Sequence, residues 1–286
     1  MENIYEETKS IMKKYNIKAN KSLGQNFLIN DEVIENIVKS SNLSKEDMVI
    51  EIGPGLGTLT KRLLEEAGKV LCVELDKKMI NILEDRFSEN DKFEVINEDI
   101  LKVDLNQIIK ENKKDNNIKN VKIVANLPYY ITTPIIMKLL EEKLEIESIT
   151  VMIQKEVADR LIEVPGGKNT GAITYTVYYY CESEKIMEVP NSSFIPEPEV
   201  TSEVIKMNLR KTPAVELENP KIMFMIIKSA FMQRRKTLLN ALTNSKVFIN
   251  KEEGTQILNK LNLDINIRAE SLTIQDFANI AKLISK

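Results

Sequence analysis

Short apolar runs alternate with amphipathic helical segments along the first two-thirds of the chain, and this alternation limits the possible folds more than any other feature. The runs rich in β-forming residues occupy positions 48–52, 70–73, 93–96, 121–125 and 149–153. Helical spacing of apolar residues fills the intervals at 58–67, 77–87, 132–140 and 156–162. Strands separated by helices predict a parallel sheet covered on both faces. A ligand of such a sheet binds beyond the carboxyl ends of its strands.

The pattern changes to helices alone after residue 220. Helical apolar spacing is found at 221–231, 234–243, 252–261 and 274–284. The segment 172–181 is rich in Tyr, Val and Thr, which favours a strand, but its place after a helix and a Gly-Gly turn favours a helix, and we expect a helix. Residues 110–120 are polar and predict a surface loop. We therefore expect two domains, 1–210 and 211–286.

Composition excludes several kinds of chemistry. The chain has 286 residues, no histidine and two cysteines, Cys72 and Cys181. Catalysis by a histidine base and a zinc site of the usual nitrogen and sulfur ligands are excluded, so we expect no metal. No apolar run reaches the roughly 18 residues of a membrane span, and the charged N-terminus is not a secretory signal. These features predict a cytoplasmic protein without a membrane partner.

Charge is distributed unevenly. The net charge is −3, but residues 211–286 hold 12 basic and 7 acidic residues, a net charge of +5, which leaves −8 on the rest. A basic tail on an acidic body suggests contact with a polyanion, although ordinary variation between solvated faces is an alternative. Arg234-Arg235-Lys236 is equally compatible with a solvated helix start and with RNA contact. A second basic stretch, Lys13, Lys14, Lys18 and Lys21, could grip phosphates from another side.

A glycine-rich turn follows the first of these strands. Gly53, Gly55 and Gly57 have G-x-G-x-G spacing, which permits a tight turn and a close approach of ligand to backbone. Thr58 stands where a dinucleotide fingerprint has its third glycine, and the Gly-Lys-Ser/Thr of a P-loop is absent. The turn therefore suits a nucleoside better than a pyrophosphate.

Two acids follow the next two strands. Glu74, 21 residues after Gly53, is placed to accept hydrogen bonds from both ribose hydroxyls. Asp99 is placed to accept from an adenine amino group. Together with the glycine turn they predict a pocket for an adenosine that carries no phosphates, and S-adenosylmethionine is such a ligand.

The segment Asn126-Leu127-Pro128-Tyr129 ends the fourth strand and has two interpretations. A planar amino group such as adenine N6 could donate to the Asn126 side chain and to a backbone carbonyl, while its ring stacks on Tyr129 and Pro128 fixes the backbone. Alternatively, Asn126 could cap the following helix, with Pro128 near its first turn. Since the carboxyl ends of parallel strands share one edge of the sheet, this amine-binding segment should adjoin the cofactor pocket.

The chain resembles the ribosomal small-subunit RNA adenine dimethyltransferases, a branch of the Rossmann-like S-adenosylmethionine-dependent methyltransferases. The segments that carry the resemblance, in order, are KSLGQNFL at 21–28, EIGPGLG at 51–57, VELD at 73–76, NED at 97–99, NLPYY at 126–130, QKEV at 154–157, FIPEPEV at 194–200 and FMQRRKTL at 231–238. The resemblance implies an α/β Rossmann-like methyltransferase domain with a small all-helical C-terminal domain that binds RNA.

The resemblance also implies the roles of individual residues. The expected cofactor contacts are Asn26, Leu28, Gly53, Gly55, Glu74, Asp99 and Asn126. Asn126, Leu127, Pro128 and Tyr129 would hold the target adenine, with Phe194 on the other face of its ring. Phe194 could instead be a core aromatic, but Pro196 and Pro198 nearby favour a surface loop.

The implied reaction is a direct methyl transfer to N6 of adjacent adenosines in small-subunit ribosomal RNA, coupled to maturation of an immature 30S-type subunit. We expect a monomer. Three alternatives remain at this stage: the related large-subunit methyltransferases that give macrolide resistance, a DNA adenine methyltransferase, and a non-enzymatic assembly factor that keeps the cofactor fold as a scaffold. The first of these usually lacks the RRKTL segment.

Overall fold

The computed structural model describes residues 3–20, 23–114 and 117–284, and within them the chain forms two compact units. Residues 1–158 and 183–209 form the first unit, and residues 159–182 and 210–286 form the second. Lys21, part of the second basic stretch, lies outside the described residues, as does Ser22. Segment 159–182, expected in the first domain, thus groups with the second unit. Whether the two units are separate functional domains stays a prediction.

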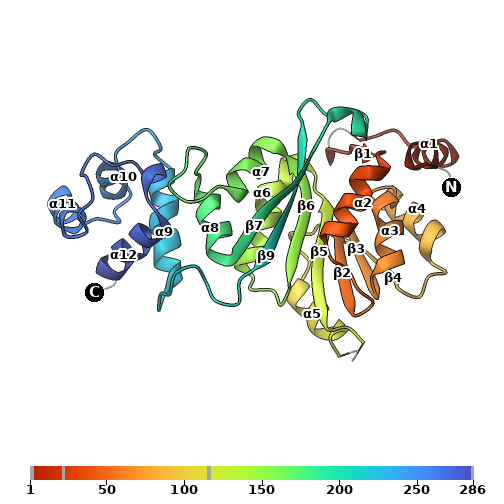
Figure 1. The fold of residues 1–286 in the computed structure, drawn as a ribbon, viewed down its shortest axis with the longest axis horizontal. Helices are drawn as coiled ribbons and strands as arrows, with labels where there is room; N and C mark the ends of the chain where they lie inside the picture. The colour runs from red at the N-terminus through yellow and green to blue at the C-terminus, as the bar shows by residue number, and fades with distance from the viewer. Residues whose placement is uncertain (1–2, 21–22, 115–116, 285–286) are drawn as a thin grey trace. The chain divides into compact units, whose positions relative to one another are not determined.

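Strands of the first unit make a seven-stranded sheet in the order β4-β3-β2-β5-β6-β9-β7 and a two-stranded sheet, β1-β8 (Figure 1). The strands are β1 (Phe27–Leu28), β2 (Asp47–Ile52), β3 (Lys69–Glu74), β4 (Phe93–Asn97), β5 (Asn120–Asn126), β6 (Ser148–Gln154), β7 (Cys181–Val189), β8 (Phe194–Ile195) and β9 (Ser202–Leu209). The five predicted strands are confirmed as β2 to β6, and they pair in parallel.

The expectation of a purely parallel sheet is wrong at one side. Strand β9 pairs antiparallel with β6, and β7 follows it at the edge. Both added strands contain charged residues, which hid them from a search for apolar runs. In β9, Glu203 and Lys206 are nevertheless buried, with 0% and 7% of their surfaces exposed.

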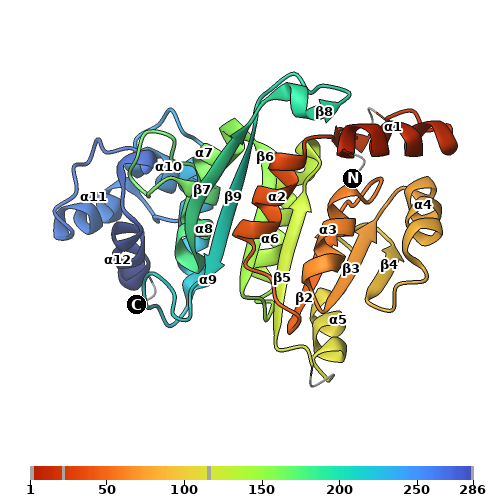
Figure 2. The same ribbon diagram turned by 45° about the vertical axis from the view of Figure 1, so that its right-hand side comes forward.

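Helices cover the sheet of the first unit. The α-helices of the chain are α1 (Ile4–Lys14), α2 (Asp31–Ser40), α3 (Thr58–Glu66), α4 (Lys77–Phe87), α5 (Leu105–Asn112), α6 (Thr132–Glu141), α7 (Lys155–Ile162), α8 (Ala172–Tyr180), α9 (Pro220–Phe231), α10 (Leu238–Asn244), α11 (Lys251–Lys260) and α12 (Ile274–Ile284). The 3-10 helices are η2 (Tyr129–Ile131), η3 (Asn191–Ser193) and η4 (Ala269–Ser271). Helices α2 and α3 pack on one face of the sheet, while α6 lies on the other (Figure 2).

The first unit's core explains its local structure. Both faces of β2 and β3 are buried, as expected of central parallel strands, so apolar residues occupy successive positions in each. Val49, Val70 and Val124 meet Ile34 and Leu63 of the covering helices in one hydrophobic cluster. This packing fixes the carboxyl ends of β2, β3 and β5 at the same edge of the sheet.

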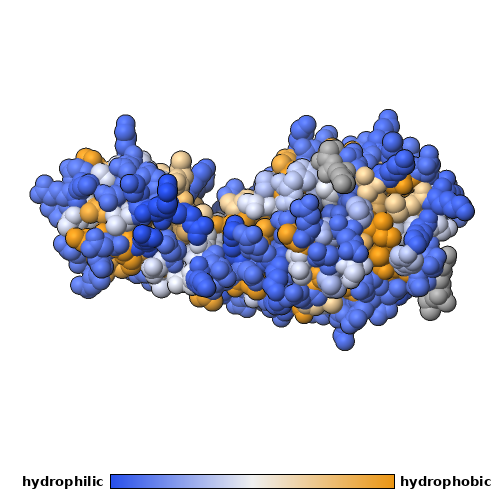
Figure 3. Space-filling view, turned by 90° about the horizontal axis from the view of Figure 1, so that it is seen from above, coloured by the Kyte–Doolittle hydropathy of each residue, from blue (hydrophilic) through white to orange (hydrophobic). Residues whose placement is uncertain are grey.

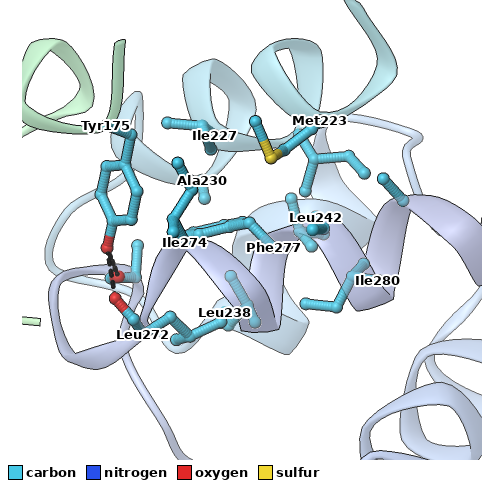
Figure 4. Packing of buried hydrophobic residues seen from close by; sticks show 14 of the residues in the cluster. Tyr175, Met223, Ile227, Ala230, Leu238, Leu242, Leu272, Ile274, Phe277 and Ile280 are labelled. Atoms are coloured by element: carbon cyan, nitrogen blue, oxygen red, sulfur yellow. Dashed lines mark hydrogen bonds between the residues drawn. The ribbon is translucent and has the colours of Figure 1, made fainter. Parts of the chain in front are cut away.

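The second unit is helical and has its own core (Figure 4). Tyr175 of α8 lies against Phe277 of α12, with ring centroids 4.9 Å apart and planes at 83°. Its hydroxyl donates to the carbonyl oxygens of Leu272 at 2.7 Å and Ala269 at 3.1 Å. The prediction of a helix at 172–181 is therefore confirmed, because its aromatic residues fill a helical core.

One predicted helix begins in the wrong place. The segment 234–243 was expected to be helical throughout, but α10 begins at Leu238. Thr237 is its N-cap and accepts a hydrogen bond from the Asn240 amide at 3.4 Å, so the basic residues 234–236 precede the helix in a turn. The interpretation of these residues as a helix start is wrong.

The prediction of a surface loop at 110–120 is wrong at its beginning, because helix α5 extends to Asn112.

Most apolar residues lie inside the two units. On the face drawn in Figure 3 hydrophilic residues predominate, and apolar residues form small groups. No helix in the described parts of the chain combines the length and apolarity needed to cross a bilayer.

Candidate active site

A cavity opens at the edge where β2, β3, β4 and β5 end. It is lined by residues of the glycine turn, of segment 23–28, of the ends of β3 and β4, and of the stretch after β5. All predicted site residues except one line this cavity: Asn26, Leu28, Gly53, Gly55, Glu74, Asp99, Asn126, Leu127, Pro128 and Tyr129. Segments far apart in the sequence therefore meet at the position expected for a parallel sheet.

The glycine turn has a backbone conformation that side chains rarely adopt. Gly53, Gly55 and Gly57 have φ values of 67°, 57° and 77°. A Cβ atom at Gly55 would also meet the Phe27 ring at 3.5 Å, and one at Gly53 would meet Pro128 at 3.8 Å. The turn thus presents backbone, rather than side chains, to the cavity, which fits a nucleoside-containing cofactor.

Glu74 is held at the end of β3 by backbone donors. Its carboxylate accepts hydrogen bonds from the amides of Gly55 at 3.1 Å and Asp76 at 2.8 Å. Burial raises the pKa of Glu74, and these amide hydrogen bonds oppose the increase. The carboxylate is therefore fixed in orientation at the wall of the cavity, where it can accept hydrogen bonds from the hydroxyl groups of a ribose.

Asp99 lies beyond β4 on the same cavity wall. Its Oδ1 accepts a hydrogen bond from the Leu101 amide at 3.0 Å. The Asn97 side chain donates to the carbonyl of Glu74 at 2.9 Å, which ties the ends of β3 and β4 together. The two predicted acids are thus held on neighbouring strands, in a position where both can contact one nucleoside.

A third acid, Glu51, was not among the predicted site residues. It is the next-to-last residue of β2, is 1% exposed and lines the cavity. Its carboxyl accepts a hydrogen bond from the Thr60 hydroxyl at 2.6 Å and from the Cys72 thiol at 3.6 Å. Burial raises the pKa of Glu51 to about 7. The position of Glu51 inside an apolar strand was a signal that could have identified it, because a buried acid there must have a hydrogen-bond partner.

Asn126 is anchored through its side-chain nitrogen. The Nδ2 atom donates to the backbone carbonyl of Asn26 at 3.3 Å. Helix α6 has no side-chain N-cap, and neither does the 3-10 helix η2 that precedes it, so the interpretation of Asn126 as a helix cap is wrong. With Nδ2 turned to Asn26, the Oδ1 atom is the part of the amide left to accept a hydrogen bond from a ligand.

Tyr129 is fixed at both ends. Its hydroxyl shares a hydrogen bond with the Ser202 hydroxyl at the start of β9, and burial raises the pKa of Tyr129. Its backbone begins η2, and the Pro128 carbonyl accepts a hydrogen bond from the Thr132 hydroxyl at 3.0 Å. Ser202 is thus a supporting residue that was not predicted, because β9 itself was missed.

Phe194 does not line the cavity. It is 1% exposed and belongs to the hydrophobic cluster that also holds Ile34 and Leu63, and its backbone pairs with Leu28 in the two-stranded sheet. The interpretation that it lies in a surface loop is wrong, and the alternative of a core aromatic is the one observed. Its predicted place against a target ring has no support in this structure.

Within the described residues, no group of three or more Cys, Asp or Glu side chains is arranged to hold a metal ion. The polar groups of the residues that line the cavity are carboxylates, amides, hydroxyls and backbone groups. Such a set can bind a nucleoside and orient an amine, and it suits chemistry that depends on positioning and electrostatics.

Comparison with known proteins finds relatives that match nearly the whole chain. The ribosomal RNA small subunit methyltransferase A of Alkaliphilus oremlandii (strain OhILAs) is 47% identical over 280 residues, which are 98% of this chain and 96% of that protein. The protein of the same name from Bacillus pumilus (strain SAFR-032) is 45% identical over 286 residues, with the same coverage of each chain.

Two solved structures share the fold. A dimethyladenosine transferase from Plasmodium falciparum is 26% identical, with a TM-score of 0.73 over 89% of this chain and 95% of that one. The 23S rRNA methyltransferase ErmE has a TM-score of 0.69 over 91% and 100% of the two chains, but only 21% identity, so it shows the fold alone.

The sequence pattern of a whole family covers both units. The family model of the ribosomal RNA adenine dimethylases matches residues 16–286. The match includes the glycine turn, the acids at the ends of β3 and β4, and the Asn126 segment, and it confirms the Rossmann-like methyltransferase fold expected from the sequence. The chain therefore belongs to the ribosomal RNA adenine dimethylase family.

Proposed function

We propose that this chain transfers methyl groups from S-adenosylmethionine to N6 of adjacent adenosines in small-subunit ribosomal RNA, and that it dimethylates each. One observation carries the proposal. The Asn126 amide, anchored through its nitrogen, lies on the same cavity as the glycine turn and Glu74. An acceptor for an exocyclic amine and a nucleoside site thus share one space.

S-adenosylmethionine would be held by the turn at Gly53 and Gly55, by Glu74 and Asp99, and by Asn26 and Leu28 on the side of the N-terminal segment. When bound, it supplies an electrophilic methyl group on a sulfonium. The chain's own contribution is to exclude water and to fix the acceptor. Phe27, packed against Gly55, covers the turn from one side.

The target adenine would donate its two N6 hydrogens to Asn126 Oδ1 and to the Leu127 carbonyl, with its ring against Tyr129. Accepting these hydrogens draws the nitrogen lone pair out of conjugation with the ring and directs it toward the methyl group. No histidine is needed, because the methylated, positively charged amine is acidic enough to lose its proton to water. The base must first leave its stack to reach the cavity.

The second unit is the part that would bind RNA. Its tail, residues 211–286, has a net charge of +5, and the residues Arg234 to Lys236 precede α10 in a turn. Basic side chains there can neutralise phosphates without reading sequence. We extend the proposal to an immature 30S-type subunit as substrate, to a monomeric enzyme and to action in the cytoplasm.

The test is a comparison of substrates. The chain is incubated with methyl-labelled S-adenosylmethionine and, separately, naked DNA, naked ribosomal RNA and undermethylated small ribosomal subunits. We expect label in the small subunits, recovered as N6,N6-dimethyladenosine after digestion. Label in DNA, or in large-subunit RNA alone, would contradict the proposal. Binding to small subunits without label transfer would identify an assembly factor instead.

A further inference from the structure

Tyr130 is a large aromatic residue exposed at the cavity of the candidate site. It lies in η2, directly after Tyr129, and 57% of its surface is exposed. It nevertheless lines the same cavity as Asn126. The Tyr130 hydroxyl has no hydrogen-bond partner among the described residues, whereas the Tyr129 hydroxyl is hydrogen-bonded to Ser202.

The Tyr130 ring rests against Gly24 of the N-terminal segment. A Cβ atom built at Gly24 would lie 3.3 Å from Cδ1 and 3.6 Å from Cε1 of the ring, and 3.8 Å from Cβ of Pro128. Gly24 has a φ of 61°, a conformation that also favours glycine. The ring is therefore supported on one side by backbone, which restricts its motion while leaving more than half of the residue open.

A supported, exposed ring beside a cavity for a flipped base is suited to stacking. RNA sequences are recognised mainly through unstacked bases that pack on aromatic side chains. When a target adenine leaves its stack, its neighbour in the strand loses a stacking partner and needs a replacement. An aromatic face adjoining the cavity provides such a replacement with any base, because every base has a flat face.

We propose that Tyr130 is a positioning residue that stacks on the nucleotide next to the target adenine and so holds the RNA strand at the mouth of the cavity. This inference rests on the proposed function. It assigns to Tyr130 a role that none of the cavity contacts described above performs, since they hold the cofactor or the target base itself. The alternative is that Tyr130 merely braces Gly24 and the segment over the cofactor.

The experiment compares three variants in methyl transfer to undermethylated small ribosomal subunits. Tyr130→Phe keeps the ring, Tyr130→Leu keeps an apolar contact with Gly24 but removes the flat face, and Tyr5→Leu on α1 is the control outside the cavity. For each, kcat and KM for subunits are measured, and the dissociation constant of S-adenosylmethionine is measured separately by calorimetry.

We expect Tyr130→Leu to raise KM for subunits about tenfold, in the range of a lost stacking contact, while the cofactor dissociation constant stays at the wild-type value. Tyr130→Phe and Tyr5→Leu should retain the wild-type KM. An unchanged KM in Tyr130→Leu would overturn the inference, and so would a loss of cofactor affinity equal to the rise in KM, which would identify a brace. Absence of transfer by the unmodified chain would instead reject the proposed function itself.

Discussion

Asn126 at the tip of β5 donates a hydrogen bond from its amide nitrogen to the backbone carbonyl of Asn26, 100 residues earlier in the chain. The bond fixes which end of the amide can face a ligand. It also links the strand end to the N-terminal segment that lines the cavity.

Replacing Asn126 with alanine removes the acceptor for the N6 hydrogens. We expect Asn126→Ala to lower kcat about 100-fold or more, as loss of a preorganised electrostatic group does, while most cofactor affinity remains. Methyl-label incorporation into undermethylated small subunits measures the first effect and calorimetry the second. Asn106→Ala, at an exposed position on α5, is the control and should leave both unchanged. Near-normal turnover in Asn126→Ala would rule out the assigned role.

Glu74 offers a test of the cofactor site alone. Glu74→Gln replaces one of the two carboxyl oxygens, which backbone amides orient, with an NH2 group, so hydrogen bonds from ribose hydroxyls should weaken. We expect the dissociation constant of S-adenosylmethionine to rise roughly tenfold, the size of one lost hydrogen bond. Calorimetric titration is the measurement, and Glu94→Gln on the exposed side of β4 is the matched control. Equal affinities in the two variants would exclude Glu74 from the cofactor site.

Glu51 predicts a specific dependence of stability on pH. Its pKa is about 7 in the folded protein against an ordinary value of 4.5, so the folded state keeps a proton that the unfolded state releases. The contribution is fully present below pH 4.5 and is lost as pH rises through about 7. We expect the stability of the wild type, relative to Glu51→Gln, to fall by up to about 3 kcal/mol between about pH 5 and about pH 8. Urea unfolding at several pH values measures this difference, and parallel curves for the two proteins would contradict it.

Gly57 and Gly171 form a matched pair for a test of packing. An added Cβ at Gly57 would lie 2.6 Å from Phe87 and 2.8 Å from Leu83, at a φ of 77°, whereas nothing lies within 4 Å of one at Gly171. We expect Gly57→Ala to lower the free energy of unfolding by about 2–4 kcal/mol, from overpacking and backbone strain together. Gly171→Ala should stay within about 0.5 kcal/mol of the wild type. Denaturant midpoints provide the measurement, and equal midpoints would refute the described turn.

The sequence predicted the central strands well because their burial on both faces leaves continuous apolar runs. It failed for β7 and β9, where Glu182, Lys185 and Glu203 interrupt any such run. Glu203 is nevertheless fully buried and ion-paired with Lys185, and a pattern of hydrophobicity cannot foresee a pairing between separate strands.

The same limit applies to the site. Asn126, Glu74 and Asp99 were identifiable because each lies at or shortly after the end of a predicted strand, and parallel strands place their ends together. Phe194 was misplaced because its strand has two residues and its partner, Leu28, lies 166 positions away in the sequence. The Asn26 carbonyl and the Ser202 hydroxyl, which orient Asn126 and Tyr129, come from distant segments with no local signal.

The inclusion of α8 in the helical unit has a practical consequence for anyone who wishes to exchange the tail between relatives. The main chain enters that unit near residue 159, leaves near 182 and re-enters near 210. A transplant of positions 211–286 alone would not include the donor's Tyr175, whose ring packs in the core of the helical unit. A working chimera must therefore carry two separate stretches of donor sequence, joined through the host's own β7 and β9.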